Sequence, residues 1–202
     1  MSAPSPVLVI GCGALGRELV ALRRVNGWPH VAFRLLPAEL HNHPERIAPA
    51  LREAIEAGRR EFGRVFVAYA DCGSRGGIDR VCAEYGIERL PGAHCYEFLA
   101  GSDAFHALAD EEPGTFYLTD FLARHFDRLV RRGLGLDRHP ELMPQYFGNY
   151  RRLVYLSQAD DPDLDARARG HARYLGLAYE RRHCGFGPFN RAVTEHVIRW
   201  RS

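Results

Sequence analysis

The chain passes from an apolar run into a polar turn at Val65-Phe66-Val67-Ala68-Tyr69-Ala70-Asp71-Cys72-Gly73. A short apolar run without polar alternation is typical of a strand that is buried on both faces, as in a parallel sheet. We therefore expect residues 65–70 to form a central strand of such a sheet. The turn that follows would lie at the carboxyl edge, where ligands of open α/β sheets usually bind.

Further candidate strands lie on both sides of this run and alternate with helical stretches. This alternation predicts an α/β fold with a doubly wound, mostly parallel sheet and helices on both faces. The expected strands cover residues 7–10, 31–36, 87–90, 153–156 and 177–179, with 116–118 as either a strand or a packed connection. We expect one domain over residues 1–202 and leave open whether it consists of two similar halves, 1–100 and 101–202.

Helices are expected where apolar residues recur at helical spacing or where capping and glycine signals frame a segment. These segments are residues 15–25, 44–62, 78–85, 102–109, 119–130, 141–150, 164–175 and 189–200. Cys82 lies inside the third of them and would pack there as a small apolar side chain.

The composition excludes several classes of function. The chain has 27 basic and 25 acidic residues, a net charge of +2 without an obvious cluster, so we expect neither a nucleic-acid nor a membrane partner. Every basic residue is arginine, which excludes a Schiff-base lysine and a Walker lysine. No apolar stretch approaches the roughly 20 residues of a membrane span. We expect a cytoplasmic protein with reduced cysteines.

Four of the five cysteines stand just past candidate strands. They are Cys12, Cys72, Cys95 and Cys184. Because parallel strands deliver the residues at their carboxyl ends to one crevice, cysteines far apart in the chain are expected to meet there.

This placement predicts a metal site of Cys12, Cys72 and Cys95. Thiolate and imidazole ligands suit zinc, and thiolates also hold iron–sulfur clusters, which are the alternative. His94 and His41 are candidates to complete the coordination. The structural alternative is that each cysteine only fills space beneath a loop. Whether Cys184 and the preceding His183 join the site stays open.

A glycine-rich turn offers a different function. Gly11-Cys12-Gly13-Ala14-Leu15-Gly16 follows the first strand and opens a helix, as dinucleotide-binding turns do. The acid that should bind the ribose is missing from the end of the second strand, where Glu39 comes only after a proline. Nucleotide binding is therefore the alternative function.

A second glycine-rich loop, with Gly73, Ser74, Arg75 and Gly76, follows Cys72. Its backbone amides could hold the anionic part of a cofactor, with Arg75 as the counter-charge. The same composition is typical of a flexible turn, which is the structural alternative.

Several of these segments together resemble one family. They are Cys12-Gly13-Ala14-Leu15, Asp71-Cys72-Gly73, Pro91-Gly92-Ala93-His94-Cys95 and Gly114-Thr115-Phe116-Tyr117-Leu118-Thr119. The chain resembles, over residues 7–150, the bacterial and archaeal family catalogued as domain of unknown function 1638. The resemblance implies a cysteine at the positions of Cys12, Cys72 and Cys95, and leaves Cys184 outside the similar part.

The resemblance also implies a setting, because members are often encoded beside corrinoid-dependent methyltransferases that act on methylated amines. A role in one-carbon or methyl transfer follows as an expectation, with a small thiol or a methylated compound as substrate. A corrinoid or methyltransferase protein is the expected partner. The chain would be either a catalyst or a non-catalytic member of such a complex, and the sequence leaves its status as an enzyme open.

Overall fold

The computed structural model describes residues 6–198 and confirms the α/β class. Its strands form two three-stranded parallel sheets, each within its own compact unit. Of the described residues, those up to Cys95 together with those from Asn190 form the first unit, and Tyr96–Phe189 form the second.

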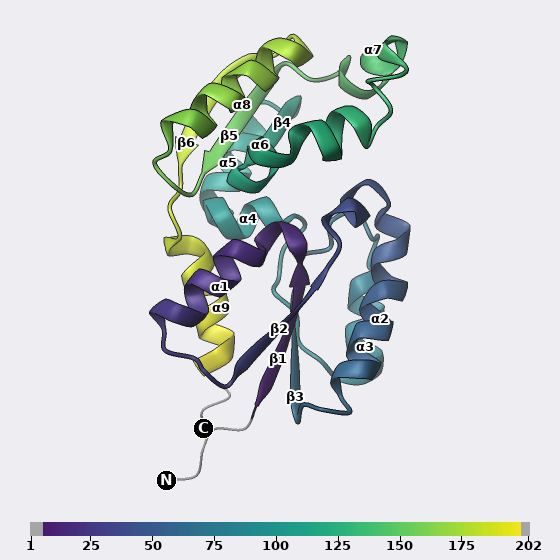
Figure 1. Cartoon of the computed structure of the whole chain (residues 1–202), viewed down its shortest axis with the longest axis vertical. Coiled ribbons are helices and arrows are strands. Elements are labelled where there is room, and N and C mark those ends of the chain that lie inside the picture. The colour runs from purple at the N-terminus through teal and green to yellow at the C-terminus, as the bar shows by residue number, and fades with distance from the viewer. Residues whose placement is uncertain (1–5, 199–202) are drawn as a thin grey trace. The chain divides into compact units, whose positions relative to one another are not determined.

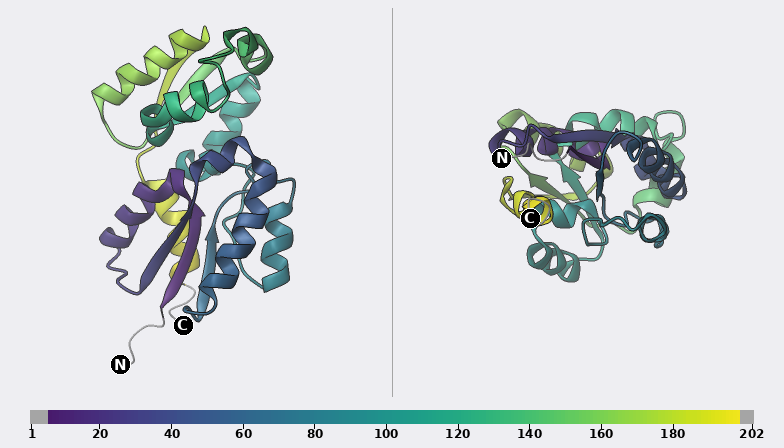
Figure 2. Two further views of the ribbon diagram at one scale, coloured as in Figure 1. Left: turned by 45° about the vertical axis from the view of Figure 1, so that its right-hand side comes forward. Right: turned by 90° about the horizontal axis from the view of Figure 1, so that it is seen from below.

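The sheet of the first unit has the order β2-β1-β3, with β1 (Val7–Cys12), β2 (Val31–Leu36) and β3 (Arg64–Ala68) all parallel. Helices cover both of its faces, as expected. Figure 1 shows α1 (Gly16–Val25) and α9 (Gly187–Ile198) on one side, and α2 (Ile47–Gly58) and α3 (Gly77–Tyr85) on the other. The turned view in Figure 2 shows the same two layers. This unit is doubly wound.

The central strand of this sheet is β1, and the prediction that residues 65–70 lie at the centre is wrong. The six residues of β1 are all buried, so β1 meets the requirement for a middle strand better than β3, whose first residue is exposed. The free edge of β3 is nevertheless covered. A single parallel bridge joins Val67 to Arg89, so the predicted strand at residues 87–90 shrinks to that bridge. Pro91, which has no amide proton, ends it.

Short 3₁₀ segments connect the elements of the first unit. They are Gly13–Leu15 before α1, then Ala38–Asn42 and Pro44–Arg46 before α2. The core between sheet and helices is made of large apolar side chains that are almost fully buried. It includes Leu8, Ile10, Leu19, Ile55 and Phe66.

The second unit has the strand order β4-β5-β6, so its topology differs from that of the first. Its strands β4 (Thr115–Thr119), β5 (Arg152–Ser157) and β6 (Ala178–His183) are parallel. Its helices are α4 (Cys95–Ala100), α5 (Ser102–Glu111), α6 (Asp120–Phe126), α7 (Met143–Phe147) and α8 (Pro162–Leu175). A π-helical segment, Asp127–Arg132, continues α6, and a 3₁₀ turn, Pro140–Leu142, precedes α7.

The two faces of this second sheet have separate cores. Helices α6 and α8 cover one face, where Leu118, Phe126, Tyr155 and Ala168 belong to one buried cluster. On the other face Leu108 of α5 packs with Val154 and Leu156.

The predicted closing helix, residues 189–200, is present as α9 from Gly187 to Ile198, and its last two residues lie outside the described part. Among residues 6–198, no helix has both the length and the apolar character needed to cross a bilayer.

Candidate thiol site

Three cysteines of the first unit lie beyond the carboxyl ends of its strands. Cys12 is the last residue of β1, Cys72 follows β3 by four residues, and Cys95 begins α4. In the order β2-β1-β3 the chain passes from β1 to β2 on one side of β1 and later forms β3 on its other side. The carboxyl end of β1 is thus the topological switch point, where open α/β sheets bind ligands.

Two of these thiols touch. The sulfur atoms of Cys72 and Cys95 lie 3.2 Å apart, and neither cysteine is in a disulfide. Main-chain hydrogen bonds fix this approach, because the Asp71 amide donates to the Gly92 carbonyl (3.1 Å) and the Cys72 amide donates to the Ala93 carbonyl (2.8 Å). The segment after β3 and the segment after Arg89 therefore stay side by side from the bridge between Val67 and Arg89 as far as the two thiols.

The two sulfur atoms differ in their protonation chemistry. A hydrogen bond from Cys95, which outweighs the effect of burial, lowers the pKa of the Cys72 thiol. The same hydrogen bond, together with burial, raises the pKa of Cys95. These two directions favour a thiolate on Cys72 with Cys95 as the donor over the reverse arrangement.

Cys12 is the third sulfur at this edge of the sheet. Burial raises its pKa to about 11, against a hydrogen bond with the Tyr69 hydroxyl that favours the thiolate. The charge of Cys72 also reaches Cys12, and Tyr69 is influenced by all three cysteines. Tyr69 itself is buried, and burial raises its pKa. Cys12, Tyr69, Cys72 and Cys95 thus form one group, which we call the thiol cluster.

The loop after Cys72 holds an anion that belongs to the chain. The Asp71 carboxylate accepts hydrogen bonds from the Ser74 hydroxyl (2.6 Å), the Gly76 amide (2.8 Å) and the Arg75 amide (3.2 Å). Burial alone would raise the pKa of Asp71, but these bonds outweigh it and lower the pKa. The amides of Arg75 and Gly76 and the hydroxyl of Ser74 are thus bonded to the chain's own carboxylate. Binding of a cofactor anion by the loop of Gly73, Ser74, Arg75 and Gly76 stays a prediction.

This loop is tightly wound. Cys72 and Arg75 have left-handed φ angles of 46° and 53°, which are uncommon for residues other than glycine. Such a conformation costs about 1–3 kcal/mol and persists where surrounding contacts impose it. Here the Asp71 carboxylate and the Ala93 carbonyl supply those contacts, so the strain is linked to the placement of the Cys72 thiol.

The two predicted histidine ligands lie close to each other. His41 belongs to the 3₁₀ segment after β2, and His94 directly precedes Cys95. Enclosure by the chain and repulsion from His94 lower the pKa of His41, although part of its side chain is exposed. An imidazole with a lowered pKa is neutral at pH 7, which is the form that binds metals.

The donors fit zinc in chemistry, but their arrangement does not yet form a coordination shell. Two sulfurs on one tetrahedral zinc ion lie about 3.8 Å apart, given Zn–S bonds of about 2.3 Å. The Cys72–Cys95 separation of 3.2 Å is somewhat shorter. Within residues 6–198, no group of three or more His, Cys, Asp or Glu side chains is already placed to hold a metal ion. A bound ion would require the pair to open and Cys12 to approach.

The glycines of the predicted nucleotide turn are explained by packing. A Cβ atom on Gly13 would lie 2.9 Å from the Leu36 carbonyl oxygen, and one on Gly16 would lie 2.7 Å from the Leu35 side chain. A Cβ on Gly11 would lie 3.0 Å from Leu19. Packing therefore requires the glycine at position 13, where the blocking atom is main-chain, whereas at Gly11 and Gly16 the nearest atom belongs to a leucine side chain that can move. Nucleotide binding by this turn stays a prediction.

Sequence reasoning missed Tyr69 as a member of the thiol cluster. It stands inside the apolar run that we interpreted as buried strand, and an aromatic residue there is normal. The signal that could have found it is the end of β3 at Ala68, because the residues beyond a strand end belong to the carboxyl edge.

The fold and this cluster define an α/β protein with buried thiols at the switch point of a parallel sheet. The chain belongs to the family described as "Protein of unknown function (DUF1638)", whose model matches residues 35–193. This confirms the family but shifts the range, since the match begins after Cys12 and includes His183 and Cys184. No curated protein and no solved structure matches the chain.

Proposed function

We propose that the thiol cluster binds a thiophilic metal ion, zinc in the first instance, through Cys72, Cys95 and Cys12. The contact of two sulfurs at 3.2 Å carries this proposal. Three further observations support it: Cys12 is close enough to be charge-coupled, the thiols lie at a switch point, and the pKa of Cys72 is lowered. An iron–sulfur cluster held by the same three cysteines is the alternative occupant.

Three protein ligands would leave one position of a tetrahedral ion open. Such an ion supplies Lewis acidity and lowers the pKa of a ligand that enters that position. His41 and His94 are the residues that could instead fill the position. A small thiol or a methylated compound is the substrate class we propose. A corrinoid methyltransferase partner and a cytoplasmic location, which would keep the thiols reduced, belong to the same proposal.

Metal analysis of protein purified under reducing, oxygen-free conditions tests this proposal. We expect about one zinc ion per chain after exposure to zinc and desalting. Replacing either Cys72 or Cys95 by serine should remove the ion, because a hydroxyl is a poor ligand for it. Cys12→Ser should weaken retention.

Cys82→Ser is the matched control for this experiment. Cys82 is a buried thiol in α3 outside the thiol cluster, so its replacement should leave the metal content unchanged. Absence of both zinc and iron from the reconstituted wild-type chain, or equal loss in all four variants, contradicts the proposal.

A second candidate function is reversible disulfide formation between Cys72 and Cys95. It is favoured by the same short separation and by the unequal pKa values of the two thiols. The Cys72 thiolate would attack a small-molecule disulfide and release one thiolate, which takes up a proton. Cys95 would then attack the Cys72 sulfur, giving the internal disulfide and a second small thiol.

The ultraviolet absorbance of thiolates, followed against pH in the reduced, metal-free chain, tests the basis of this candidate. One thiolate should appear at lower pH than an ordinary cysteine, because the hydrogen bond from Cys95 stabilises the charged form. Cys95→Ala should shift that transition to higher pH and decrease the thiolate present at pH 7 severalfold. Cys82→Ser should not shift it, and an unchanged curve in Cys95→Ala contradicts the assignment.

A further inference from the structure

The second unit contains a pocket of about 570 Å³ at the carboxyl end of its sheet, apart from the thiol cluster. This volume lies in the range of small-molecule sites. One wall is formed by Ala100, Ala104 and Ala107, and the buried side chains of Leu108 and Leu156 also line it. This part of the pocket is apolar and offers no group for a ligand's charge.

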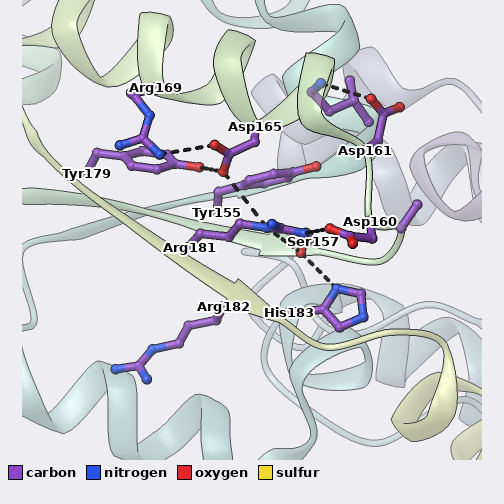
Figure 3. Close-up of polar contacts among 12 residues, drawn as sticks. Tyr155, Ser157, Asp160, Asp161, Asp165, Arg169, Tyr179, Arg181, Arg182 and His183 are labelled. Carbon is purple, nitrogen blue, oxygen red and sulfur yellow. Dashed lines mark hydrogen bonds and ion pairs between the residues drawn. The ribbon is translucent and has the colours of Figure 1, made fainter.

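Cationic and polar groups stand at the opposite end, where β6 stops. Arg182 and His183 line the pocket there. Figure 3 shows Arg181 and Arg182 leaving β6 on opposite sides, as alternate residues of a strand do. Arg181 pairs with Asp160, whereas Arg182 is turned away from that cluster.

Arg182 is held by one side of its guanidinium. Its Nε atom is paired with Glu180, and Glu180 also pairs with Arg152 at 3.0 Å. Among residues 6–198, Glu180 is the one acidic partner of Arg182. The two Nη nitrogens of its guanidinium have the fork geometry that suits a carboxylate.

His183 is fixed by a chain of hydrogen bonds. Arg181 Nε donates to the Ser157 hydroxyl oxygen (3.2 Å), and that oxygen lies 3.1 Å from His183 Nδ1. The hydroxyl oxygen thus contacts both side chains and links the imidazole to Arg181. This contact uses Nδ1, and the other ring nitrogen, Nε2, is a donor when it carries a proton.

Two carboxylates lie at or beside the pocket, and each has an arginine partner. Glu111 of α5 lines the pocket, and Arg152 binds it at 3.0 Å. The same Arg152 Nη1 atom also pairs with Glu180, the partner of Arg182, so both carboxylates are neutralised by arginine. A carboxylate bound at Arg182 could place its uncharged part against the alanines of α5 that line the pocket.

We propose that this pocket binds a small organic monocarboxylate with a short apolar chain, its carboxylate on Arg182 and His183. This site is independent of the thiol cluster, so each proposal can fail without the other.

Isothermal titration calorimetry of the full chain with hexanoate at pH 7 tests the proposal. Hexanoate should bind saturably, and hexan-1-ol and hexylammonium, which have the same carbon chain, should bind at least about tenfold more weakly. Arg182→Gln should weaken hexanoate binding by about tenfold or more. Arg138→Gln, at an exposed position of the same unit, should not change it.

A filling substitution separates the pocket from a surface charge effect. Ala104 is exposed on α5 and lines the pocket, so Ala104→Phe should block the site without disturbing the core, with folding checked by near-ultraviolet circular dichroism. Absence of saturable binding, equal binding in Ala104→Phe and wild type, or inorganic phosphate binding as tightly as hexanoate would each overturn the proposal.

Discussion

Replacing Asp120 by alanine is expected to destabilise the second unit by about 3–5 kcal/mol. Asp120 is buried at the start of α6, directly after β4. Its carboxylate accepts hydrogen bonds from the Tyr155 hydroxyl (2.7 Å) and from the main-chain amides of Gln158 (3.1 Å) and Ala159 (3.1 Å). Alanine would leave all three donors without this acceptor, and each unsatisfied buried donor costs about 1–3 kcal/mol.

The effect should be measured by hydrogen exchange of the β5 amides, because the two units need not unfold together. Asp110→Ala is the matched control, since Asp110 is exposed on α5, and it should change stability by less than about 0.5 kcal/mol. Asp120→Asn should have a stability between those of wild type and Asp120→Ala, because its amide nitrogen cannot accept a hydrogen bond and would face one of the donors. Equal protection in Asp120→Ala and Asp110→Ala would show that the network is not a source of stability.

The strands with apolar sequences could be predicted well, and those with polar ones could not. The strand expected at residues 31–36 has those bounds as β2, because its residues are almost all apolar. For β6 the expected strand was 177–179, but β6 extends to His183. Its residues Glu180, Arg181 and Arg182 form ion pairs with groups on both sides of the sheet. Such pairing leaves no hydrophobic pattern to detect.

The convergence of cysteines could be predicted in part, for a topological reason. Strand ends of a parallel sheet meet, which placed Cys12 and Cys72 on the same edge. The contact of Cys95 with Cys72 depends on hydrogen bonds between the segment around Ala93 and the Asp71 loop, and those involve only main-chain atoms. No side-chain pattern encodes them. The role of Asp71 as the anion in its own loop was missed for a related reason, because two of the three donors to its carboxylate are main-chain amides, which every sequence contains.

The turn between β1 and α1 leads to the second large effect. Gly13→Ala is expected to destabilise the first unit by about 2–3 kcal/mol. A Cβ atom at Gly13 would lie 2.9 Å from the Leu36 carbonyl oxygen and 3.4 Å from the Ala38 amide nitrogen. Both are main-chain atoms at the end of β2, so no side-chain rotation can relieve the contact and the strand end itself must move.

Denaturant unfolding followed by tryptophan fluorescence measures this effect in the first unit alone. Trp28 is buried there, and residues 96–189 contain no tryptophan. Gly63→Ala is the matched control, because a Cβ at Gly63 would meet nothing within 4 Å and its φ lies outside the left-handed region. It should be neutral or slightly stabilising. If Gly13→Ala unfolds at the same denaturant concentration as Gly63→Ala, close packing does not explain this glycine, and a role in binding a phosphate becomes the better explanation.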